Sequence, residues 1–285
     1  MKVFQERLCD HYAQVFAIDR HVYSGETEFQ SVLIFENRLF GRVLVLDGIV
    51  QLTDRDNHIY HEMIAHVPLM AHGSVGRVLL IGGGDGGTLK EVLKHPVERV
   101  VMVEIDDGVI QLSKRFFPQV SRGAFDDPRV DLLIEDAVEY VARAESMFDA
   151  VIVDSTDPVG PGEQLFTETF YERCRSLLRP GGVIALQSGA SSFNPEQLGG
   201  VCGRLVRSFE AVRPYLAPVP SYAGGALALI AAGESGKSLL PAMKTLRERD
   251  RRLQLRTSYY TPEVHGAAFT LAAGYIPRQK QQQRP

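Results

Sequence analysis

Short apolar runs separated by turn-forming residues dominate the N-terminal part of the chain. Runs rich in β-branched and aromatic residues predict strands at 15–18, 28–36, 42–46 and 49–52. Asp47-Gly48, between the last two runs, is typical of a hairpin turn. Apolar residues at helical spacing then predict a helix from about Asp56 to His72. The pattern therefore predicts a small antiparallel β unit followed by a helix.

From Arg77 onward, apolar runs alternate with stretches of helical pattern. Strands are predicted at 78–81, 100–104, 130–134, 149–154, 182–187, 211–219 and 225–232. Helices are predicted between them, at 86–94, 107–116, 136–143, 166–178 and 195–208. Strands separated by helices of this length form a parallel, doubly wound sheet. We therefore expect an α/β fold, with a small antiparallel β domain (residues 1–60) before a Rossmann-like domain (residues 61–285).

The composition is that of an ordinary soluble globular protein. Hydrophobic residues make up 45% of the chain and charged residues 23%. A net charge of -4 and an isoelectric point near 6.1 give no reason to expect nucleic acid as a partner. The N-terminus lacks a signal-peptide core and no apolar stretch is long enough to span a bilayer, so we expect a cytoplasmic protein. Three cysteines without paired spacing indicate neither a disulfide framework nor a zinc site.

A glycine-rich turn follows the first strand of the Rossmann-like region. Gly82, Gly84 and Gly87 fit the G-x-G-x-x-G spacing of a nucleotide-binding turn, and a helical run follows them. Glu104 ends the next strand, about 20 residues further on, where its carboxylate can accept both hydroxyl protons of a ribose. Strand, turn, helix, strand and acid together predict a nucleoside pocket. The alternative is a tight turn with a capping acid.

Asp85 lies inside this turn and indicates which nucleoside binds. A dinucleotide would place its pyrophosphate against the turn, where a carboxylate repels it. The same carboxylate attracts a cation. The ligand is therefore predicted to be an adenosine with a positive charge near its 5′ end, such as S-adenosylmethionine or its decarboxylated form, and an NAD-dependent dehydrogenase is disfavoured.

Carboxylates stand at the end of each early strand in the Rossmann-like region, at Asp85, Glu104, Asp106, Glu135, Asp136, Asp154 and Asp157. Strand ends of a parallel sheet meet at one crevice. Any single acid here can be a helix N-cap, but the whole set requires a compensating cation. No histidine cluster supports a transition metal, whereas magnesium and a polyamine both stay open. For a polyamine channel, the candidate residues are Tyr60, Glu62, Asp157 and Tyr222.

The loop at 157–163 places prolines and glycines beside these acids. Such a loop fits a closing lid and fits a rigid crossover equally well.

Several motifs, in order, resemble the spermidine synthase family of polyamine aminopropyltransferases. The resemblance runs from about Gln30 to Gly225, with a further match at 259–269. The motifs that carry it are Leu-Asp-Gly-Ile-Val-Gln (46–51), Tyr-His-Glu-Met (60–63), Ile-Gly-Gly-Gly-Asp-Gly-Gly (81–87), Val-Glu-Ile-Asp (103–106), Asp-Asp-Pro-Arg (126–129) and Asp-Ser-Thr-Asp-Pro-Val-Gly-Pro (154–161).

The resemblance implies a fold, an activity and an assembly. The fold would be a small β domain followed by a methyltransferase-type Rossmann domain, assembled as a homodimer or homotetramer. The activity would move the aminopropyl group of decarboxylated S-adenosylmethionine, a co-substrate, to a primary amine and release 5′-methylthioadenosine. Putrescine, giving spermidine, is the default acceptor. Neither a cofactor nor a metal is implied.

The resemblance also implies roles for individual residues. Gln30 and Gln51 would lie beside the nucleoside and its aminopropyl arm, Asp85 and Asp154 would hold the ammonium of that arm, Glu104 would take the ribose, and Asp136 with Ala137 would face the adenine. Tyr60, His61, Asp157, Gln187 and Tyr222 would line the acceptor's path. Asp154 would be the base that deprotonates the amine, aided by the Tyr60 hydroxyl.

The acceptor wall departs from the family pattern at Ser188, Ser221, Ala223 and 226–230, and the chain has no tryptophan. Smaller side chains there can admit another acceptor, such as cadaverine, diaminopropane or spermidine, or can be ordinary core variation. Two other functions stay open, a small-molecule methyltransferase and a non-catalytic protein that binds polyamines or nucleosides.

Overall fold

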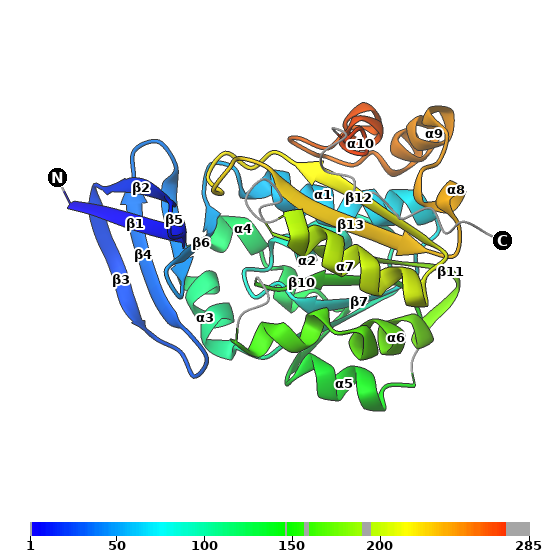
Figure 1. Ribbon diagram of the computed structural model, residues 1–285, viewed down its shortest axis with the longest axis horizontal. Helices are drawn as coiled ribbons and strands as arrows, with labels where there is room; N and C mark the ends of the chain where they lie inside the picture. Colours follow the sequence, from blue (N-terminus) through cyan, green and yellow to red (C-terminus); the bar gives the residue numbers. More distant parts are fainter. Residues whose placement is uncertain (1, 146, 157–159, 190–194, 272–285) are drawn as a thin grey trace.

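The structure is a computed structural model that describes residues 2–271 except 146, 157–159 and 190–194. A small β region lies beside a larger α/β region (Figure 1). The small region contains a hairpin of β1 (Lys2–Cys9) and β2 (Tyr12–Ile18). It also contains a four-stranded antiparallel sheet in the order β3 (Arg20–Glu26), β4 (Ser31–Asn37), β5 (Gly41–Leu46) and β6 (Ile49–Thr53).

Strands β1 and β3 were not predicted, and the predicted strand at 28–36 begins only at Ser31. Residues 27–30 form a turn instead, because the backbone N–H of Thr27 donates to the carbonyl of Gln30 at 2.9 Å. The Thr27 hydroxyl also accepts from the Gln30 N–H at 3.1 Å. Side-chain oxygens of this kind favour turns over continued strand.

Aromatic packing holds the β1–β2 hairpin on the small sheet. The ring centroid of Phe4 lies 5.7 Å from that of Phe35, and the Phe16 centroid lies 5.6 Å from that of Phe40. Phe35 is fully buried. Tilted aromatic pairs at these distances stabilise the packing beyond the area that they bury. The hairpin therefore has a fixed position at the edge of the cavity described below.

The larger region is built on a seven-stranded sheet. Its order is β12 (Ala211–Ala217), β13 (Leu227–Gly233), β11 (Leu178–Gln187), β10 (Phe148–Asp154), β7 (Arg77–Gly82), β8 (Arg99–Glu104) and β9 (Val130–Ile134). β13 runs antiparallel to both neighbours, so the prediction of a wholly parallel sheet was wrong at this strand. Only a loop joins β12 to β13, and a loop without a crossover helix returns the chain antiparallel.

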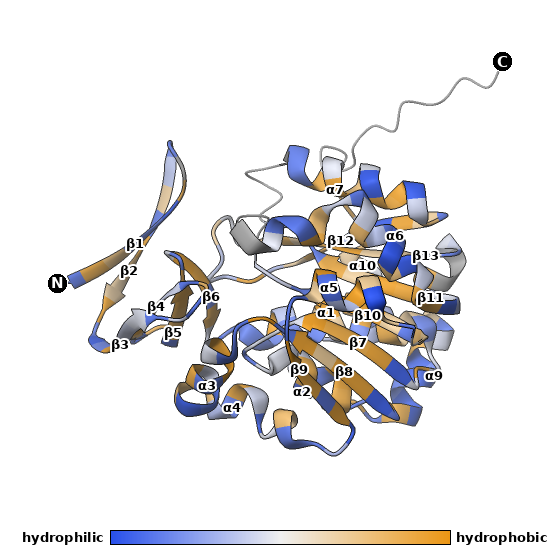
Figure 2. Ribbon diagram, turned by 90° about the horizontal axis from the view of Figure 1, so that it is seen from below, coloured by the Kyte–Doolittle hydropathy of each residue, from blue (hydrophilic) through white to orange (hydrophobic). Residues whose placement is uncertain are grey.

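Helices cover both faces of this sheet. α1 (Asn57–His72) and α2 (Gly87–Leu93) pack on one face, where α9 (Met243–Leu253) packs on α1, and α10 (Pro262–Ala268) packs on α9 and β12. The other face carries α5 (Ala137–Arg143), α6 (Glu168–Ser176) and α7 (Pro195–Ser208). The shorter elements are α4 (Pro118–Ser121), α8 (Gly236–Leu239) and two 3-10 helices, Ala124–Asp126 and Gly160–Phe166. Figure 2 shows the apolar colouring of the central strands β7, β8 and β10.

The small sheet and the large region share a core. α3 (Asp107–Phe116) and the segment after it bury Val109, Phe117 and Val120 against Val32 and Ile34 of β4. The two regions are therefore packed together at the side where the strands β7 and β8 end.

In the described part of the chain, no helix is long and apolar enough to cross a membrane.

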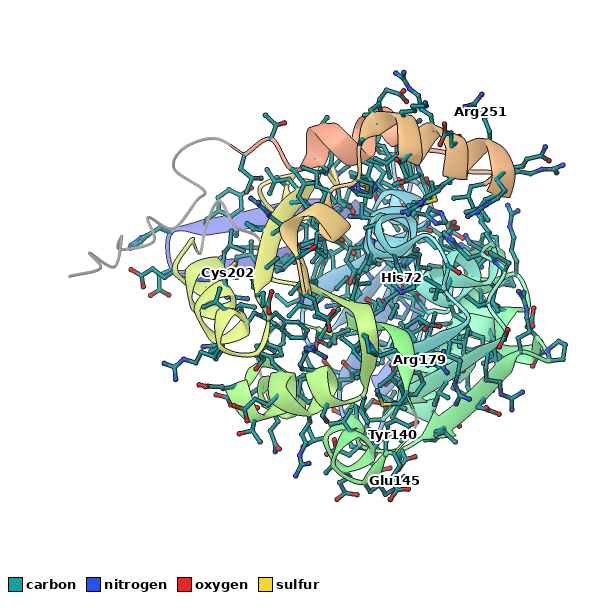
Figure 3. All side chains as sticks on the ribbon, turned by 90° about the vertical axis from the view of Figure 1, so that its right-hand side faces the viewer. His72, Tyr140, Glu145, Arg179, Cys202 and Arg251 are labelled. Atoms are coloured by element: carbon teal, nitrogen blue, oxygen red, sulfur yellow. The ribbon has the colours of Figure 1, made fainter. Side chains whose placement is uncertain are left out.

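The opposite end of the sheet has a structural ion pair. Arg179, at the start of β11, donates to Asp149 at 3.1 Å, and Figure 3 shows Arg179 on the face turned away from the small region. Asp149 also accepts from the N–H groups of Gly76 and Arg77 at 2.8 Å. These contacts tie the beginnings of three neighbouring strands and leave the other end of the sheet to the candidate site.

Candidate active site

A cavity lies at the carboxyl ends of β7, β8 and β10, between the large sheet and the small β region. Most of the predicted site residues line it, namely Gln30, Gln51, Tyr60, Asp85, Glu104, Asp136, Ala137, Asp154, Gln187 and Tyr222. Asp157 lies outside the described residues, as does part of the 157–163 loop, so the choice between a lid and a rigid crossover is untested. The structure thus brings ten of the predicted residues to one place.

The glycine turn is joined directly to the end of β10. Gly82 has a φ of 76°, and a Cβ there would lie 2.2 Å from the carbonyl oxygen of Asp154. The N–H of Gly83 donates to that same oxygen at 2.8 Å. A larger residue at Gly82 is therefore excluded by both its conformation and its surroundings. This contact fixes Asp154 next to the turn that carries Asp85.

Glu104 is a buried carboxylate at the end of β8. Its Oε1 accepts from the backbone N–H of Asp106 at 3.0 Å. Burial, with the nearby charge of Asp106, raises the pKa of Glu104 to about 7. The ionised form of such a buried carboxylate is poorly solvated, so a ligand that donates hydrogen bonds to it stabilises it strongly. The two hydroxyls of a ribose can donate such bonds.

Asp85 forms an ion pair with His61. One Asp85 oxygen accepts from the N–H of Gly87 at 2.6 Å, and the other lies 3.0 Å from His61 Nε2. Burial disfavours ionisation of both groups, but their mutual attraction and hydrogen bond outweigh it, so the pKa of Asp85 is lowered and that of His61 is raised. Asp85 therefore enters the cavity as a charged carboxylate.

His61 contacts Asp85 from helix α1, outside the cavity lining. Its side chain is 2% exposed and is not part of the described cavity lining, where the family resemblance would place it on the acceptor's path. A Cβ at Gly87 would lie 2.2 Å from the His61 ring, so the last glycine of the turn makes room for the imidazole. A direct contact of His61 with an acceptor stays a prediction.

Tyr60 and Asp154 form a second hydrogen-bonded pair inside the cavity. The Tyr60 hydroxyl donates to Asp154 Oδ1 at 2.6 Å. Burial, and then the charge of Asp154, raise the pKa of Tyr60 well above 10, so the hydroxyl stays protonated. Burial and the neighbouring Asp85 charge raise the pKa of Asp154. A carboxylate with a raised pKa is a stronger base, which suits Asp154 to accept a proton.

Two further acids act partly as helix caps. Asp106 accepts from the N–H of Val109 at 3.2 Å at the start of α3, and it also accepts from Gln30 Nε2 at 3.1 Å. Asp136 accepts from the N–H of Val138 at 2.7 Å while it lines the cavity. Each acid therefore serves both as a helix cap and as part of the site. Asp106 caps α3 and positions Gln30, and Asp136 caps α5 at the cavity wall.

The remaining wall is formed by loops far apart in the sequence. The Tyr222 hydroxyl donates to the backbone carbonyl of Gln51 at 2.6 Å, and its ring is 6.2 Å from that of Tyr60. Gln187 donates to the carbonyl of Ser155 at 3.1 Å. Tyr222 thus joins the small sheet to the loop after β12.

The residues that depart from the family pattern divide into two groups. Ala223 and Leu227 line the cavity and can change its shape. Ser221 instead binds Asp56, donating from its N–H at 2.8 Å and from its hydroxyl at 2.9 Å. The chain at 228–230 is fully buried within β13. Only the first group therefore bears directly on the acceptor.

Glu62 has a structural role and is not part of the channel. It accepts from the backbone N–H groups of Ser258, Tyr259 and Tyr260 at 2.7, 2.8 and 2.7 Å. These bonds attach the C-terminal segment to α1. Glu62 was among the candidates for a polyamine channel, and that prediction was wrong because its carboxylate binds these backbone groups and is not part of the cavity lining.

The sequence reasoning missed residues that reach the cavity from β1. Glu6 and Leu8 line it, although they precede every strand that the pattern predicted. In this segment the apolar pair Val3-Phe4 is followed by three polar residues, Gln5, Glu6 and Arg7, so it lacks the period-two alternation that predicts a strand. Among the residues that the structure describes, no group of three or more histidine, cysteine or acidic side chains is arranged to hold a metal ion.

The structure has a Rossmann-like fold with a cavity at the strand ends, the place where such folds bind nucleosides, and several carboxylates line this cavity. Comparison with known proteins gives its family. The Spermine/spermidine synthase domain matches residues 57–239, and the Spermidine synthase tetramerisation domain matches residues 3–54. The chain belongs to the spermine/spermidine synthase family.

Relatives and solved structures agree with this assignment. The chain is 47% identical over 272 residues to the polyamine aminopropyltransferase of a Ruegeria species, covering 95% of each chain. It is 46% identical over 273 residues to polyamine aminopropyltransferase 1 of Pseudomonas aeruginosa, again covering 95% of each. A spermidine synthase in complex with the transition state analogue AdoDATO matches with a TM-score of 0.89 at 36% identity, over 95% of this chain and 92% of that one. Spermidine synthase from Thermotoga maritima matches with a TM-score of 0.88, at the same identity and coverage.

Proposed function

We propose that this protein transfers the aminopropyl group of decarboxylated S-adenosylmethionine to a primary amine and releases 5′-methylthioadenosine. Putrescine is the proposed acceptor. The observation that carries the proposal is the arrangement of Asp85 and Asp154 in one cavity with Glu104. Glu104 suits a ribose, and the two aspartates suit a cationic arm attached to the same nucleoside.

The donor binds across the ends of β7, β8 and β10. Glu104 accepts from the ribose hydroxyls, Asp136 and Ala137 face the adenine, and Gln30 and Gln51 flank the nucleoside and its arm. The arm ends in an ammonium that lies between Asp85 and Asp154. The sulfonium is then near both carboxylates, which stabilise its positive charge in a buried site.

The acceptor amine must lose a proton before it can attack, because its pKa is about 10 in water. Asp154 accepts this proton, and the Tyr60 hydroxyl holds the carboxylate in place through the hydrogen bond at 2.6 Å. The free amine then attacks the methylene next to sulfur. A nitrogen–carbon bond forms, the carbon–sulfur bond breaks, and the electron pair remains on sulfur as a neutral thioether. Because the sulfonium is itself a good leaving group, the step requires no cofactor and no covalent enzyme intermediate.

We also propose that the protein is a homo-oligomer, with a tetramer favoured over a dimer. The match of residues 3–54 to a domain described by tetramerisation supports this proposal. Sedimentation or light scattering of the purified protein measures the assembly directly.

Methylthioadenosine binding should depend on pH through Glu104. The pKa of this group is about 7 without ligand, and the ribose hydroxyls bind its ionised form. Ligand therefore lowers the pKa, so affinity is full above about pH 7 and falls as the pH drops below it, by up to about tenfold per unit. Calorimetric titrations between pH 5 and 8, roughly the range over which a group with this pKa changes its charge, test this. Affinity that is flat across the range contradicts it, and Glu104→Gln should remove the dependence.

His61 should act through Asp85. His61→Ala removes the hydrogen bond and the charge that hold Asp85 ionised, so the catalytic efficiency with the donor should fall about 10- to 100-fold. His61→Gln keeps a donor at a similar reach and should retain most of the activity. Steady-state kinetics with each substrate varied in turn test this. An effect confined to the acceptor KM would show that His61 contacts the amine directly.

A panel of amines tests the acceptor. Methylthioadenosine release is measured with decarboxylated S-adenosylmethionine and diaminopropane, putrescine, cadaverine or spermidine. The proposal expects the highest efficiency with putrescine. A higher efficiency with another amine would assign that acceptor and attribute the change to the wall at Ala223 and Leu227. S-adenosylmethionine with the same amines is the control for methyl transfer.

A further inference from the structure

The turn between β3 and β4 brings two residues of the small sheet into the wall of the cavity, Phe29 and Gln30. The Thr27 hydroxyl sets the shape of this turn, because it accepts from the backbone N–H of Phe29 at 3.2 Å and from that of Gln30 at 3.1 Å. A threonine hydroxyl has two lone pairs and one proton. Both lone pairs are therefore used inside the turn, and the proton is left for a partner outside it.

That proton links the turn to the large region. The Thr27 hydroxyl donates to Asp106 Oδ2 at 2.5 Å, and Gln30 Nε2 donates to the same oxygen at 3.1 Å. Asp106 follows β8 and is 1% exposed. Thr27 also packs closely on the start of α3, where a Cβ at Gly108 would lie 2.7 Å from Thr27 Cγ2. Hydrogen bonds to a carboxylate are stronger than those between neutral groups, so Asp106 holds both the turn and the Gln30 side chain.

Asp106 is itself fixed within the large region. Its Oδ1 accepts from the N–H of Val109 at 3.2 Å, and its backbone N–H donates to Glu104 at 3.0 Å. One residue therefore connects Glu104, the proposed acceptor of the ribose hydroxyls, with Gln30 of the small region. The relative position of these two side chains is set before any ligand binds.

The Gln30 amide could face a ligand in two orientations, which exchange its nitrogen and its oxygen. The Asp106 carboxylate only accepts, so it keeps the amide nitrogen on its own side. A side chain that is already ordered loses less conformational entropy when a ligand binds. We propose that Thr27 and Asp106 are positioning residues for the donor, which hold Gln30 in one orientation against the nucleoside. The proposal rests on the proposed function, in which Gln30 lies beside the donor.

Thr27→Val tests this role, because valine keeps the shape of the side chain and removes the hydroxyl. The dissociation constant of 5′-methylthioadenosine should rise about 5- to 30-fold, as expected for the loss of a hydrogen bond to a buried carboxylate. Thr27→Ser keeps the hydroxyl and should bind like the wild type. The putrescine KM at saturating donor should stay within about twofold in both variants, since the acceptor does not contact this turn in the proposed arrangement.

Thr261→Val is the matched control. The Thr261 hydroxyl also accepts from the N–H three residues further on, that of Val264, at 3.1 Å, and Thr261 is not part of the described cavity lining. Loss of this helix cap can lower the free energy of unfolding. It should leave the affinity for methylthioadenosine unchanged, which separates a loss of stability from a loss of positioning.

A double-mutant cycle shows whether Thr27 acts through Gln30. If it does, Thr27→Val should change the dissociation constant by less than about twofold once Gln30→Ala is present. Effects of the two substitutions that add in full would overturn the proposal, as would wild-type affinity in Thr27→Val. Wild-type protein that binds no methylthioadenosine would instead refute the nucleoside site on which the proposed function depends.

Asp106→Asn provides a second test that keeps the helix cap. The asparagine oxygen can still accept from the Val109 N–H, which places its NH₂ group where Thr27 and Gln30 both donate. The Gln30 amide must then turn, so methylthioadenosine should bind at least as weakly as it does to Thr27→Val. Burial and the Asp106 charge raise the pKa of Glu104 to about 7, so the titrations are made at about pH 8, where Glu104 is largely ionised in both proteins. Wild-type affinity in Asp106→Asn would contradict the proposal.

Discussion

Asp154→Asn is expected to lower the rate of methylthioadenosine release by about 10²- to 10⁴-fold, the usual contribution of a general base. An amide has no basic oxygen and cannot take the proton from the amine. It fills nearly the same volume and can still accept the hydrogen bond from Tyr60, so donor binding should change far less than turnover.

The measurement is kcat at saturating donor and amine, together with the dissociation constant for methylthioadenosine. Asp107→Asn, an exposed acid at the start of α3, is the matched control and should behave like the wild type. A variant at Asp154 that retains more than about a tenth of the wild-type kcat would show that another group accepts the proton.

S-adenosylmethionine is expected to bind at least about 100-fold more weakly than its decarboxylated form. The two donors differ by the α-carboxylate, which would lie against Asp85 and Asp154. Like charges repel strongly in a buried cavity where water screens them poorly. We therefore expect the two carboxylates to select the donor by repulsion as well as by attraction.

Asp85→Asn should narrow the difference in affinity between the two donors. It removes one of the two charges that repel S-adenosylmethionine, and it also weakens the binding of the decarboxylated donor. Competition against methylthioadenosine gives both affinities for the wild type and the variant. Similar wild-type affinities for the two donors, or a difference that Asp85→Asn leaves unchanged, would argue that the carboxylates do not discriminate between them.

The sequence predicted the parts of the site that depend on local pattern and on strand order. The apolar run before Gly82 predicts a buried strand, and a parallel strand must end at the common crevice. Asp85, Glu104 and Asp154 could therefore be placed together before their distances were known. The fold class followed from the same alternation of strands and helices.

Other features could not be predicted because they depend on contacts between distant segments. β1 has a weak strand pattern and is stabilised by the packing of Phe4 on the small sheet, so Glu6 had no predicted place. His61 and Glu62 are adjacent in the sequence, yet one binds Asp85 in the glycine turn and the other binds the backbone near Tyr260. Only the direction of each side chain on α1 separates these roles.

The most direct test is the stoichiometry of the reaction with decarboxylated S-adenosylmethionine and putrescine. Chromatography with mass detection measures methylthioadenosine and the aminopropylated amine in one sample. Aminopropyl transfer predicts equal amounts of the two products, formed at a rate proportional to enzyme concentration and lost in Asp154→Asn. Methylthioadenosine without a matching amine product would indicate hydrolysis of the donor, and a methylated amine in its place would contradict the proposed reaction.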